Sequence, residues 1–421
     1  MKKIPAWKPY CSLLAALLIP AAANADVVLD WNLIMQTTVS SQTPFPQARF
    51  AAITQLAVFE AVNAITGDYK PYLGTITAPR GASAEAAAIA AAHAVLKNYF
   101  PANAPALDAA YTMSLATIPA GSARDAGVSV GEAAAAAMIA NRANDGSSPA
   151  KFYLPTSSSP GVWQLTPSCT PAGGAFFHWQ NVTPFGIRSA DQFRLDPPPA
   201  LSSGRYARTY NEVKDVGAIN STDRPQDRAD VVHFYAAVAA TGVFNPVFRQ
   251  LSATHKNSLS ENAHDLALLN MAINDAAVAT FDAKYFYNFW RPETAIHNGD
   301  LDGNGRTDPD PAFAPFIVTP CFPSYPSAHG TLSNAARAVL ERAFGNVRQA
   351  MTLSDPAAPG IVLHYTRLEQ ITDDISDARV YGGIHFRTDQ DAGESLGIRL
   401  GQYVYEHNLR RVHGNDHDDR N

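Results

Sequence analysis

The sequence predicts an all-α protein. Three observations point to this class: Ala-rich stretches of high helix propensity, apolar residues that repeat at helical spacing, and no sustained strand-like alternation along 421 residues. Hydrophobic residues make up 46% and charged residues 17%, which excludes disorder and coiled coil as descriptions of the whole chain. The formal net charge of −6 argues against nucleic-acid binding, which needs a basic surface. The composition is that of a globular protein.

The first 25 residues have the features of a cleaved signal peptide. Three lysines form a basic start, an apolar run follows from Ser12 to Ile19, and Ala23-Asn24-Ala25 offers a small-x-small cleavage site. The run is too short to span a bilayer, and no later segment is apolar for long enough. We therefore expect a secreted or periplasmic product without a membrane span, and a formal net charge that falls from −6 to −9 on cleavage.

Export leaves two cysteines, Cys169 and Cys321, in a compartment where disulfides persist. We predict that they pair and tie the middle of the chain to its C-terminal half. Two separate thiols are the alternative, because a sequence does not show whether two Cα atoms are close enough for a bridge.

Four helices are expected in the first part of the mature chain. The first, Phe50–Ala64, follows a loop around Pro44 and Pro46 and has apolar residues at helical spacing. The other three are rich in alanine: Ala82–Phe100, Pro105–Ala116 and Ser122–Ala143. From about Gly146 to Ser203 the composition shifts to Pro, Gly, Ser, Thr and aromatic residues. This shift predicts a long irregular segment, and such segments within compact proteins often carry function.

Helical patterning resumes near Asp227. The stretch from Ser260 to Trp290 is apolar nearly all round, which is typical of a helix buried at the centre of a bundle. Three further helices are expected, Thr331–Phe344, Leu368–Tyr381 and Gln390–His407. Residues 410–421 are charged and predict a disordered tail. We therefore expect a single domain over residues 26–409, with helical halves at 26–145 and 204–409 joined by the irregular segment 146–203.

The first cluster of chemical interest is Lys284-Tyr-Phe-Tyr-Asn-Phe-Trp-Arg291-Pro292. Seven residues make about two helical turns, so we expect both cations on one face of a helix that Pro292 ends. Two cations on an otherwise apolar helix need an anionic partner, because a buried unpaired charge is costly. A pair of structural salt bridges is the alternative interpretation.

The second cluster is Tyr325-Pro326-Ser327-Ala328-His329-Gly330, just before an expected helix. Free backbone N–H groups at a helix start, together with the Ser327 hydroxyl, form a cradle for an anion. His329 beside it could act as a general acid or base. An ordinary helix cap next to a surface histidine is the alternative.

The third cluster runs from Arg379 through Gly382-Gly383 and His385 to Asp389. Arg379 and His385 would face different sides of one continuous helix, so we expect the two glycines to break it and turn both side chains toward one pocket. Asp389 can accept a hydrogen bond from the His385 ring and fix the tautomer that leaves the other nitrogen free. A core histidine paired with an aspartate is the alternative.

The three clusters together carry a recognisable order: K-x6-R-P, then P-S-x-H, then R-x5-H-x3-D, between Lys284 and Asp389. This order resembles the signature shared by type 2 phosphatidic acid phosphatases and vanadium-dependent haloperoxidases. The surrounding Phe-Trp-Arg-Pro, Phe-Pro-Ser-Tyr-Pro-Ser and Gly-Gly-Ile-His-Phe-Arg are more similar to the haloperoxidase branch. The resemblance implies two four-helix bundles with an anion site in the bundle interior.

The resemblance also implies a role for each motif residue. Donors from all three clusters would hold the oxyanion: Lys284, Arg291, Ser327, the N–H of Ala328, and Arg379. His385 would be the ligand of vanadate and His329 the acid–base group, while Phe322 falls where chloride-oxidising members carry a Phe near the halide. The chain departs from the usual pattern at Ala328 and Ala378, where Gly and Ser are common. Neither departure removes a charge.

These motifs identify a cradle for an oxyanion and leave the reaction open. The favoured interpretation is an exported vanadate-dependent haloperoxidase that oxidises a halide with hydrogen peroxide, with vanadate as the Lewis acid. The first alternative is an acid phosphatase without a cofactor, in which His385 attacks a phosphomonoester to form a phosphohistidine and His329 protonates the leaving oxygen. The second is a non-catalytic oxyanion-binding protein.

The loop from Asp300 to Asp308 imitates the start of an EF-hand, with side-chain oxygens at the first, third, fifth and ninth positions and Gly at the sixth. The twelfth position is Pro311 instead of Glu. The pattern therefore favours a connection rich in Asx turns over a calcium site.

Overall fold

The computed structural model describes residues 26–345 and 348–412. The predicted signal peptide, residues 1–25, lies outside the described residues, as do residues 413–421 of the predicted tail. The first three residues of that tail are ordered: the Lys70 N–H donates to the Arg410 carbonyl at 2.8 Å, and the Val412 N–H donates to the Asp68 carbonyl at 2.9 Å.

The all-α prediction is confirmed. The N-terminal part of the described chain forms a first group of helices: α1 (Val27–Val39), α2 (Pro44–Thr66), α3 (Ala84–Tyr99), the 3-10 turn η1 (Pro101–Asn103), α4 (Ala104–Ala116) and α5 (Ser122–Asn141). The loop expected around Pro44 and Pro46 is instead the start of α2. A proline fits the first turn of a helix because its missing N–H has no partner there in any case.

A second group of helices follows the irregular segment: α6 (Gly204–Gly217), α7 (Gln226–Ala237), α8 (Ala240–His255), α9 (Leu259–Tyr287), α10 (Pro292–His297), η3 (Gly299–Leu301), α11 (Ala328–Phe344), α12 (Leu368–Tyr381) and α13 (Arg387–His407). The prediction that helices resume near Asp227 is wrong, because α6 comes first and Ser203 caps it by accepting from the Tyr206 N–H at 3.1 Å. A short antiparallel hairpin, β1 (Met351–Leu353) and β2 (Leu363–Tyr365), is also unpredicted.

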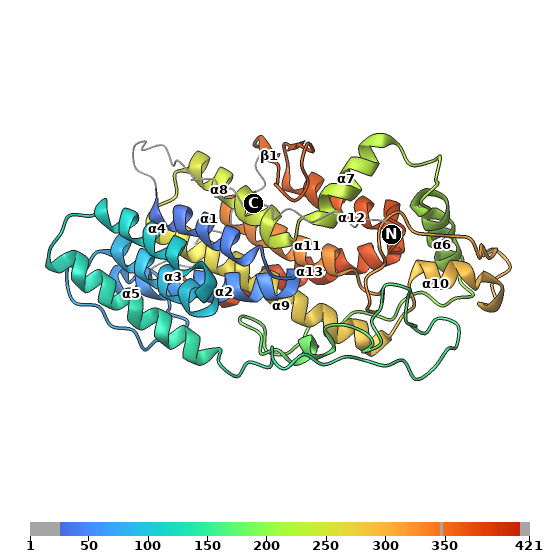
Figure 1. The fold of residues 1–421 in the computed structure, drawn as a ribbon, viewed down its shortest axis with the longest axis horizontal. Helices are drawn as coiled ribbons and strands as arrows, with labels where there is room; N and C mark the ends of the chain where they lie inside the picture. The colour runs from blue at the N-terminus through green and yellow to red at the C-terminus, as the bar shows by residue number, and fades with distance from the viewer. Residues whose placement is uncertain (1–25, 346–347, 413–421) are drawn as a thin grey trace, which may run out of the picture.

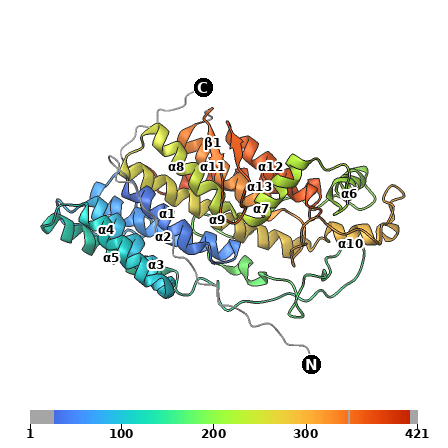
Figure 2. The same cartoon turned by 45° about the horizontal axis from the view of Figure 1, so that its top comes forward.

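Helix α9 is the centre of the molecule. It packs against α2 on one side and against α11 and α13 on another, and its residues are buried nearly all round, as the sequence predicts. Figures 1 and 2 show α3, α4 and α5 at one end of the elongated molecule and α6 and α10 at the other. Two helical groups, one built on α2, α3 and α5 and one on α11, α12 and α13, are thus joined through α9.

Helices α11 and α13 approach each other closely because of a row of glycines on α13. Gly393, Gly397 and Gly401 face α11, and a Cβ atom on Gly397 would lie 2.4 Å from the Thr331 carbonyl oxygen. Near the N-terminal ends of the two helices, the Ser327 N–H donates to the Asp389 carbonyl at 2.9 Å. The row of glycines therefore allows the second and third motifs to meet.

The predicted irregular segment is confirmed, with one 3-10 turn inside it, η2 (Phe177–Asn181). It runs along the lower edge of Figure 1. Buried Asp275 of α9 fastens it by accepting from three successive backbone N–H groups, those of residues 185–187, at 2.6–3.0 Å. The predicted disulfide between Cys169 and Cys321 is also present, with the two Cα atoms 5.1 Å apart. The segment is thereby tied to the residues that precede the second motif.

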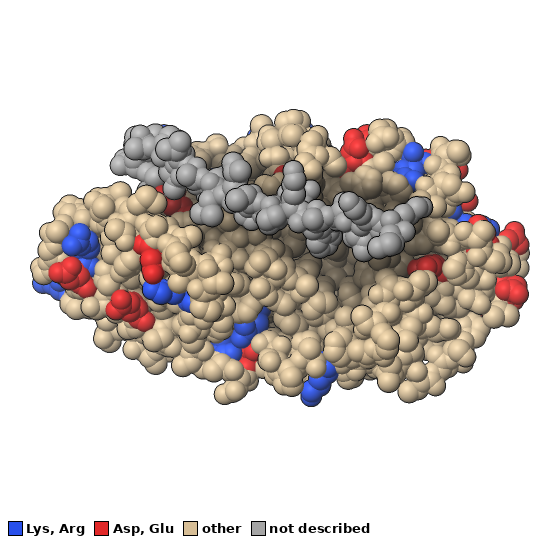
Figure 3. Space-filling view, in the orientation of Figure 1, with Lys and Arg blue, Asp and Glu red and all other residues tan. Residues whose placement is uncertain are grey.

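One described helix, α2, is long and apolar enough to cross a bilayer, and α7 with α8 passes the same test only as a pair bent by 100°. Of the apolar window in α2, 83% is buried inside the protein, as in a core helix. On the face shown in Figure 3, the Lys and Arg side chains of the described residues are scattered among Asp and Glu.

Candidate active site

The first motif does not lie on one helix. Helix α9 ends at Tyr287, Asn288 adopts a left-handed conformation with φ 47°, and Arg291 is the residue before α10. The prediction of a shared helix face for Lys284 and Arg291 is therefore wrong. Asparagine tolerates the left-handed region, which ends α9 early, and Pro292 begins a new helix where it was expected to end the old one.

The two cations instead donate hydrogen bonds to the backbone carbonyls of one segment, residues 322–324. Lys284 Nζ donates to the carbonyls of Pro323 and Ser324, both at 2.8 Å, and Arg291 Nε donates to the Phe322 carbonyl at 2.8 Å. Both side chains are fully buried. These bonds are to neutral carbonyls, so they orient the two charges without neutralising them.

The second motif begins α11. Ser327 is fully buried and its Oγ accepts from the Gly330 N–H at 3.2 Å, which is the helix cap given above as the alternative. That bond does not use the hydroxyl proton, so Ser327 keeps a donor for a ligand. Ala328 and His329 form the first turn, where backbone N–H groups have no partner within the helix. Ala328 is buried and His329 half-buried.

In the third motif the expected break is confirmed. Helix α12 ends at Tyr381 and Gly383 has a φ of 79°. A Cβ atom on Gly383 would lie 2.3 Å from the Gly217 carbonyl oxygen, so both the backbone conformation and the space require glycine. Arg379 stays in the last turn of α12, and His385 stands just before α13, each 2% exposed.

The hydrogen bonds of His385 determine its tautomer. Nδ1 lies 2.9 Å from Asp389 Oδ2, and Nε2 lies 3.0 Å from Arg291 Nη1. A guanidinium only donates, so Nε2 accepts and the proton of the neutral ring is on Nδ1. The arrangement matches the expectation that Asp389 leaves the second ring nitrogen unprotonated.

Ser324 also belongs to this group, although the sequence analysis assigned it no role. Its Oγ donates to Asp389 Oδ2 at 2.6 Å, and the Phe386 N–H donates to the same oxygen at 3.1 Å. Burial raises the pKa of Asp389 to about 6, and these donors together with Lys284 and Arg291 oppose the rise. The sequence feature that could have identified Ser324 is its position in Phe-Pro-Ser-Tyr-Pro-Ser, three residues before the motif residue Ser327.

Burial dominates the electrostatics of the three cations. It lowers the pKa of Arg291 to about 9 and that of Arg379 to about 10, and it lowers the pKa of Lys284 well below its ordinary value, with Arg291 adding to that effect. The pKa values of His329 and His385 also fall well below the ordinary histidine value through burial and then through the same three cations. Both imidazoles thus lie in the field of all three positive charges.

Several donors in this group have no partner among the described residues. Arg291 Nη2 and Arg379 Nε and Nη2 are buried without a hydrogen bond. Buried polar groups are normally satisfied, and a buried charged donor without an acceptor is especially costly. An anion with several oxygens would satisfy these donors and offset the positive charge, so the residues fit an oxyanion.

An aromatic wall borders the cations. The Phe322 ring centroid lies 5.2 Å from Lys284 Nζ and 5.0 Å from the Arg291 guanidinium carbon. Three further phenyl rings pack around Phe322 with centroids at 5.3–6.4 Å: Phe45, Phe176 and Phe281. Such a wall lowers the local dielectric constant and strengthens charge interactions. Of these four rings, sequence reasoning identified Phe322 alone.

Comparison with known proteins agrees with this fold. The family model described as the VCPO second helical-bundle domain matches residues 264–414. A bacterial vanadium-dependent iodoperoxidase superposes with a TM-score of 0.76 at 24% identity, covering 92% of this chain and 96% of its own. The apo-type structure of a bacterial vanadium-dependent chloroperoxidase gives 0.72 at 18% identity, covering 87% and 94%. Residues 264–414 therefore resemble the second helical-bundle domain of a vanadium chloroperoxidase, and the described chain shares the fold of these two peroxidases.

A curated relative is the vanadium chloroperoxidase of Curvularia inaequalis, 24% identical over 53% of this chain. The match spans 47% of that relative, less than half its length. All the predicted site residues fall within the part of the chain that matches the second helical-bundle domain.

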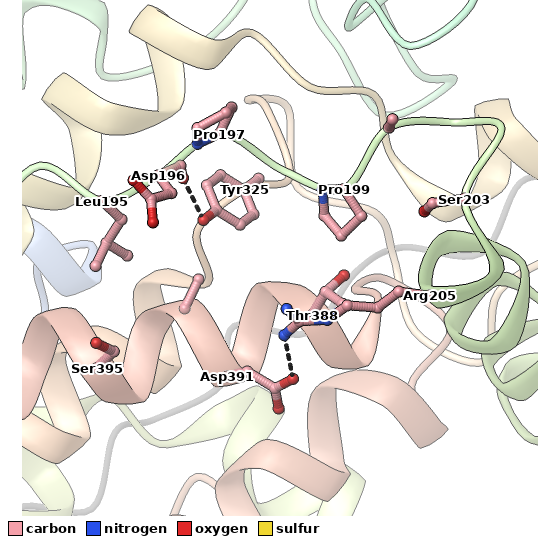
Figure 4. A pocket seen from close by; sticks show the side chains of 12 residues that line it. Leu195, Asp196, Pro197, Pro199, Ser203, Arg205, Tyr325, Thr388, Asp391 and Ser395 are labelled. Carbon is pink, nitrogen blue, oxygen red and sulfur yellow. Dashed lines mark hydrogen bonds and ion pairs between the residues drawn. The ribbon is translucent and has the colours of Figure 1, made fainter.

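A cavity of about 420 Å³ lies at the start of the second motif and of helix α13 (Figure 4). Tyr325 and Thr388, the sequence neighbours of Ser324 and Asp389, line it, and the Tyr325 hydroxyl donates to the Asp196 carbonyl at 2.7 Å. Arg205 of α6 pairs with Asp391 of α13 at 3.1 Å beside it. Through Tyr325 and Thr388 the cavity borders the second and third motifs.

The loop at residues 300–308 is a connection built on Asx turns, as the sequence favours. Asp302 Oδ1 accepts from the Asn304 N–H at 2.7 Å, and both Asp302 oxygens accept from Thr307 Oγ1. Internal partners thus satisfy the carboxylate of Asp302.

Proposed function

We propose that the chain is an exported vanadate-dependent haloperoxidase that uses hydrogen peroxide to oxidise a halide. The unpartnered, buried guanidinium nitrogens of Arg291 and Arg379, close to the unprotonated Nε2 of His385, carry the proposal. An anion that accepts several hydrogen bonds would satisfy these guanidinium nitrogens, and it would also need to bond to Nε2 of His385. Vanadate meets both requirements, and the names of the chloroperoxidase and iodoperoxidase relatives support it.

The proposed ligand set comes from all three motifs. Vanadate oxygens would be held by Lys284, Arg291, Arg379, the Ser327 hydroxyl and the Ala328 N–H, and His385 Nε2 would bond to vanadium. When bound, vanadate supplies Lewis-acid activation of hydrogen peroxide toward attack by a halide. Asp389 keeps the ring proton of His385 on Nδ1, so that the Nε2 lone pair remains available.

His329 is the proposed acid–base residue. Its lowered pKa leaves the ring neutral at pH 7, so it can accept a proton from hydrogen peroxide and later return it to the product. The Phe322 wall reduces the access of water to the same region, which strengthens the charge interactions there.

Export is part of the proposal. The basic, apolar and small-x-small pattern of residues 1–25 supports it, and the Cys169–Cys321 disulfide is suited to an oxidising compartment.

The test uses the mature chain, purified free of vanadate and divided between two assays. One follows the oxidation of iodide, bromide and chloride by hydrogen peroxide with and without added vanadate, and the other follows the hydrolysis of p-nitrophenyl phosphate. We expect halide oxidation that requires vanadate and that phosphate inhibits competitively. Phosphomonoester hydrolysis without vanadate-dependent halide oxidation would identify a phosphatase. Anion binding without either reaction would identify a binding protein.

A further inference from the structure

We propose that Ser324 is a positioning residue of the oxyanion site: its hydroxyl holds Asp389, and through it holds His385 with Nε2 directed at the anion. The inference rests on the proposed function in one respect, the role of His385 as the ligand. Nothing in the motif pattern or the comparisons assigns a role to this serine.

The hydroxyl of Ser324 lies between the other two residues. It is fully buried, donates to Asp389 Oδ2 at 2.6 Å, and its oxygen lies 3.3 Å from His385 Nδ1. A hydroxyl has one proton, and the carboxylate receives it, so the serine presents a lone pair to Nδ1. The Nδ1–H therefore faces two acceptors, and both favour the tautomer whose Nε2 is unprotonated.

The carboxylate of Asp389 needs this support because only one of its oxygens is used. Oδ2 takes all three hydrogen bonds, from Ser324, His385 and the Phe386 N–H, while Oδ1 is buried without a partner among the described residues. Without the serine hydroxyl, Oδ2 keeps two donors. A rotation of the Asp389 carboxylate that exchanges Oδ1 and Oδ2 then costs less free energy. The orientation of the His385 ring then loses its restraint.

The backbone of Ser324 is fixed by other contacts. Its N–H donates to the Phe289 carbonyl at 2.9 Å, its carbonyl accepts from Lys284, and the next residue, Tyr325, is bonded to Asp196 (Figure 4). The hydroxyl is therefore held in place before any ligand arrives, which is the property expected of a residue that supports a binding site. Ser324→Ala removes the hydroxyl and leaves the backbone carbonyl that accepts a hydrogen bond from Lys284.

The experiment compares Ser324→Ala with a matched control, Ser252→Ala. Ser252 is also buried and donates a hydrogen bond of the same length, 2.6 Å, but its partner is Asn262, outside the three motifs. Titration calorimetry of the mature chain measures the affinity for inorganic phosphate and for vanadate. We expect Ser324→Ala to weaken both by about tenfold, the lower end of the effect of losing such a support. Ser252→Ala should stay within about twofold of wild type.

Nitrogen-15 NMR of His385, assigned by the loss of its signals in His385→Gln, provides a readout that a purely structural role would not move. The wild-type ring should carry its proton on Nδ1, and Ser324→Ala should give a mixture of tautomers. If Ser324→Ala does not fold, Ser324→Cys keeps a weaker donor of similar shape and should give an intermediate affinity.

The outcomes separate the two proposals. Unchanged anion affinity and an unchanged tautomer in Ser324→Ala would overturn the inference, as would a wild-type ring protonated on Nε2. A wild-type chain that binds neither phosphate nor vanadate would overturn the proposed function, and the tautomer measurement would still decide the role of Ser324.

Discussion

Nη1 of Arg291 lies 3.0 Å from Nε2 of His385 and donates to it. The bond uses the single free lone pair of the neutral ring, so an anion that bonds to Nε2 must displace this N–H. The same Nη1 also donates to the Ile384 carbonyl at 2.8 Å, and Nη2 has no partner among the described residues. Arg291 thus remains anchored to the protein when its bond to His385 is exchanged for one to the anion.

Replacing Arg291 by Gln should weaken phosphate and vanadate binding by about 10- to 100-fold, because a hydrogen bond to a charged group contributes about 1.5–3 kcal/mol. Calorimetric titration measures the loss. Arg205→Gln is the control, since Arg205 is exposed and pairs with Asp391 beside the cavity at the start of α13. Equal affinities for wild type and Arg291→Gln would show that the cation does not contact the anion.

The two histidines should have different roles. His385→Ala should abolish tight vanadate binding, while the three cations retain a loosely held anion. His329→Ala should leave vanadate bound and slow turnover by about 10²–10⁴, the usual effect of losing a general acid–base group. Equilibrium vanadate titration of both variants tests this assignment. Loss of binding in His329→Ala together with retention in His385→Ala would reverse it.

The affinity for an anion should fall at alkaline pH. The cations bind an anion in their protonated forms, and burial lowers the pKa of Arg291 to about 9 and that of Arg379 to about 10, with Lys284 also lowered. The measurement uses sulfate because sulfate keeps its charge across this range. Above about pH 9 the sulfate affinity should fall by up to about tenfold per pH unit for each group that deprotonates. Constant affinity up to pH 11, with the fold intact by circular dichroism, would contradict this.

The close approach of α11 and α13 should not tolerate a side chain at Gly397. Helix propensity alone favours Ala over Gly by about 1 kcal/mol. A Cβ atom there would lie 2.4 Å from the Thr331 carbonyl oxygen, so we expect Gly397→Ala to lower the free energy of unfolding by about 1–3 kcal/mol. Gly305→Ala serves as the control, because a Cβ atom at Gly305 meets nothing within 4 Å. Urea denaturation measures whether the substitution raises or lowers the free energy of unfolding. A stabilised Gly397→Ala variant would show that the two helices can separate at little cost.

The disulfide should account for both cysteines of the mature chain. Thiol titration of the unfolded, unreduced protein should find essentially no free thiol. Replacing Cys169 and Cys321 together by Ser should cost about 2–5 kcal/mol of stability, as is usual for a native bridge. Two reactive thiols in freshly purified, oxidised protein would refute the pairing.

Much of the helical fold could be predicted because its signals are local. The expected range of α12 is the observed one, and α4 begins one residue before the expected Pro105. Helices α1 and α6 went unpredicted, and α6 lies next to the stretch whose Pro, Gly and Ser content indicated an irregular segment. The end of α9 was also misplaced, since a single Asn in the left-handed conformation leaves little trace in an otherwise helical pattern.

The sequence by itself determined which chemical groups this protein brings to the candidate site: three cations, two histidines, a capping serine and an aspartate four residues after His385. It also determined the break at Gly382-Gly383, because glycine conformation is a local property. Only the tertiary structure decided that Lys284 and Arg291 meet on the carbonyls of residues 322–324, and that Ser324 and three more phenyl rings join the site. These contacts join residues far apart in the chain, and they depend on how closely α13 packs against α11, a distance that no local pattern encodes.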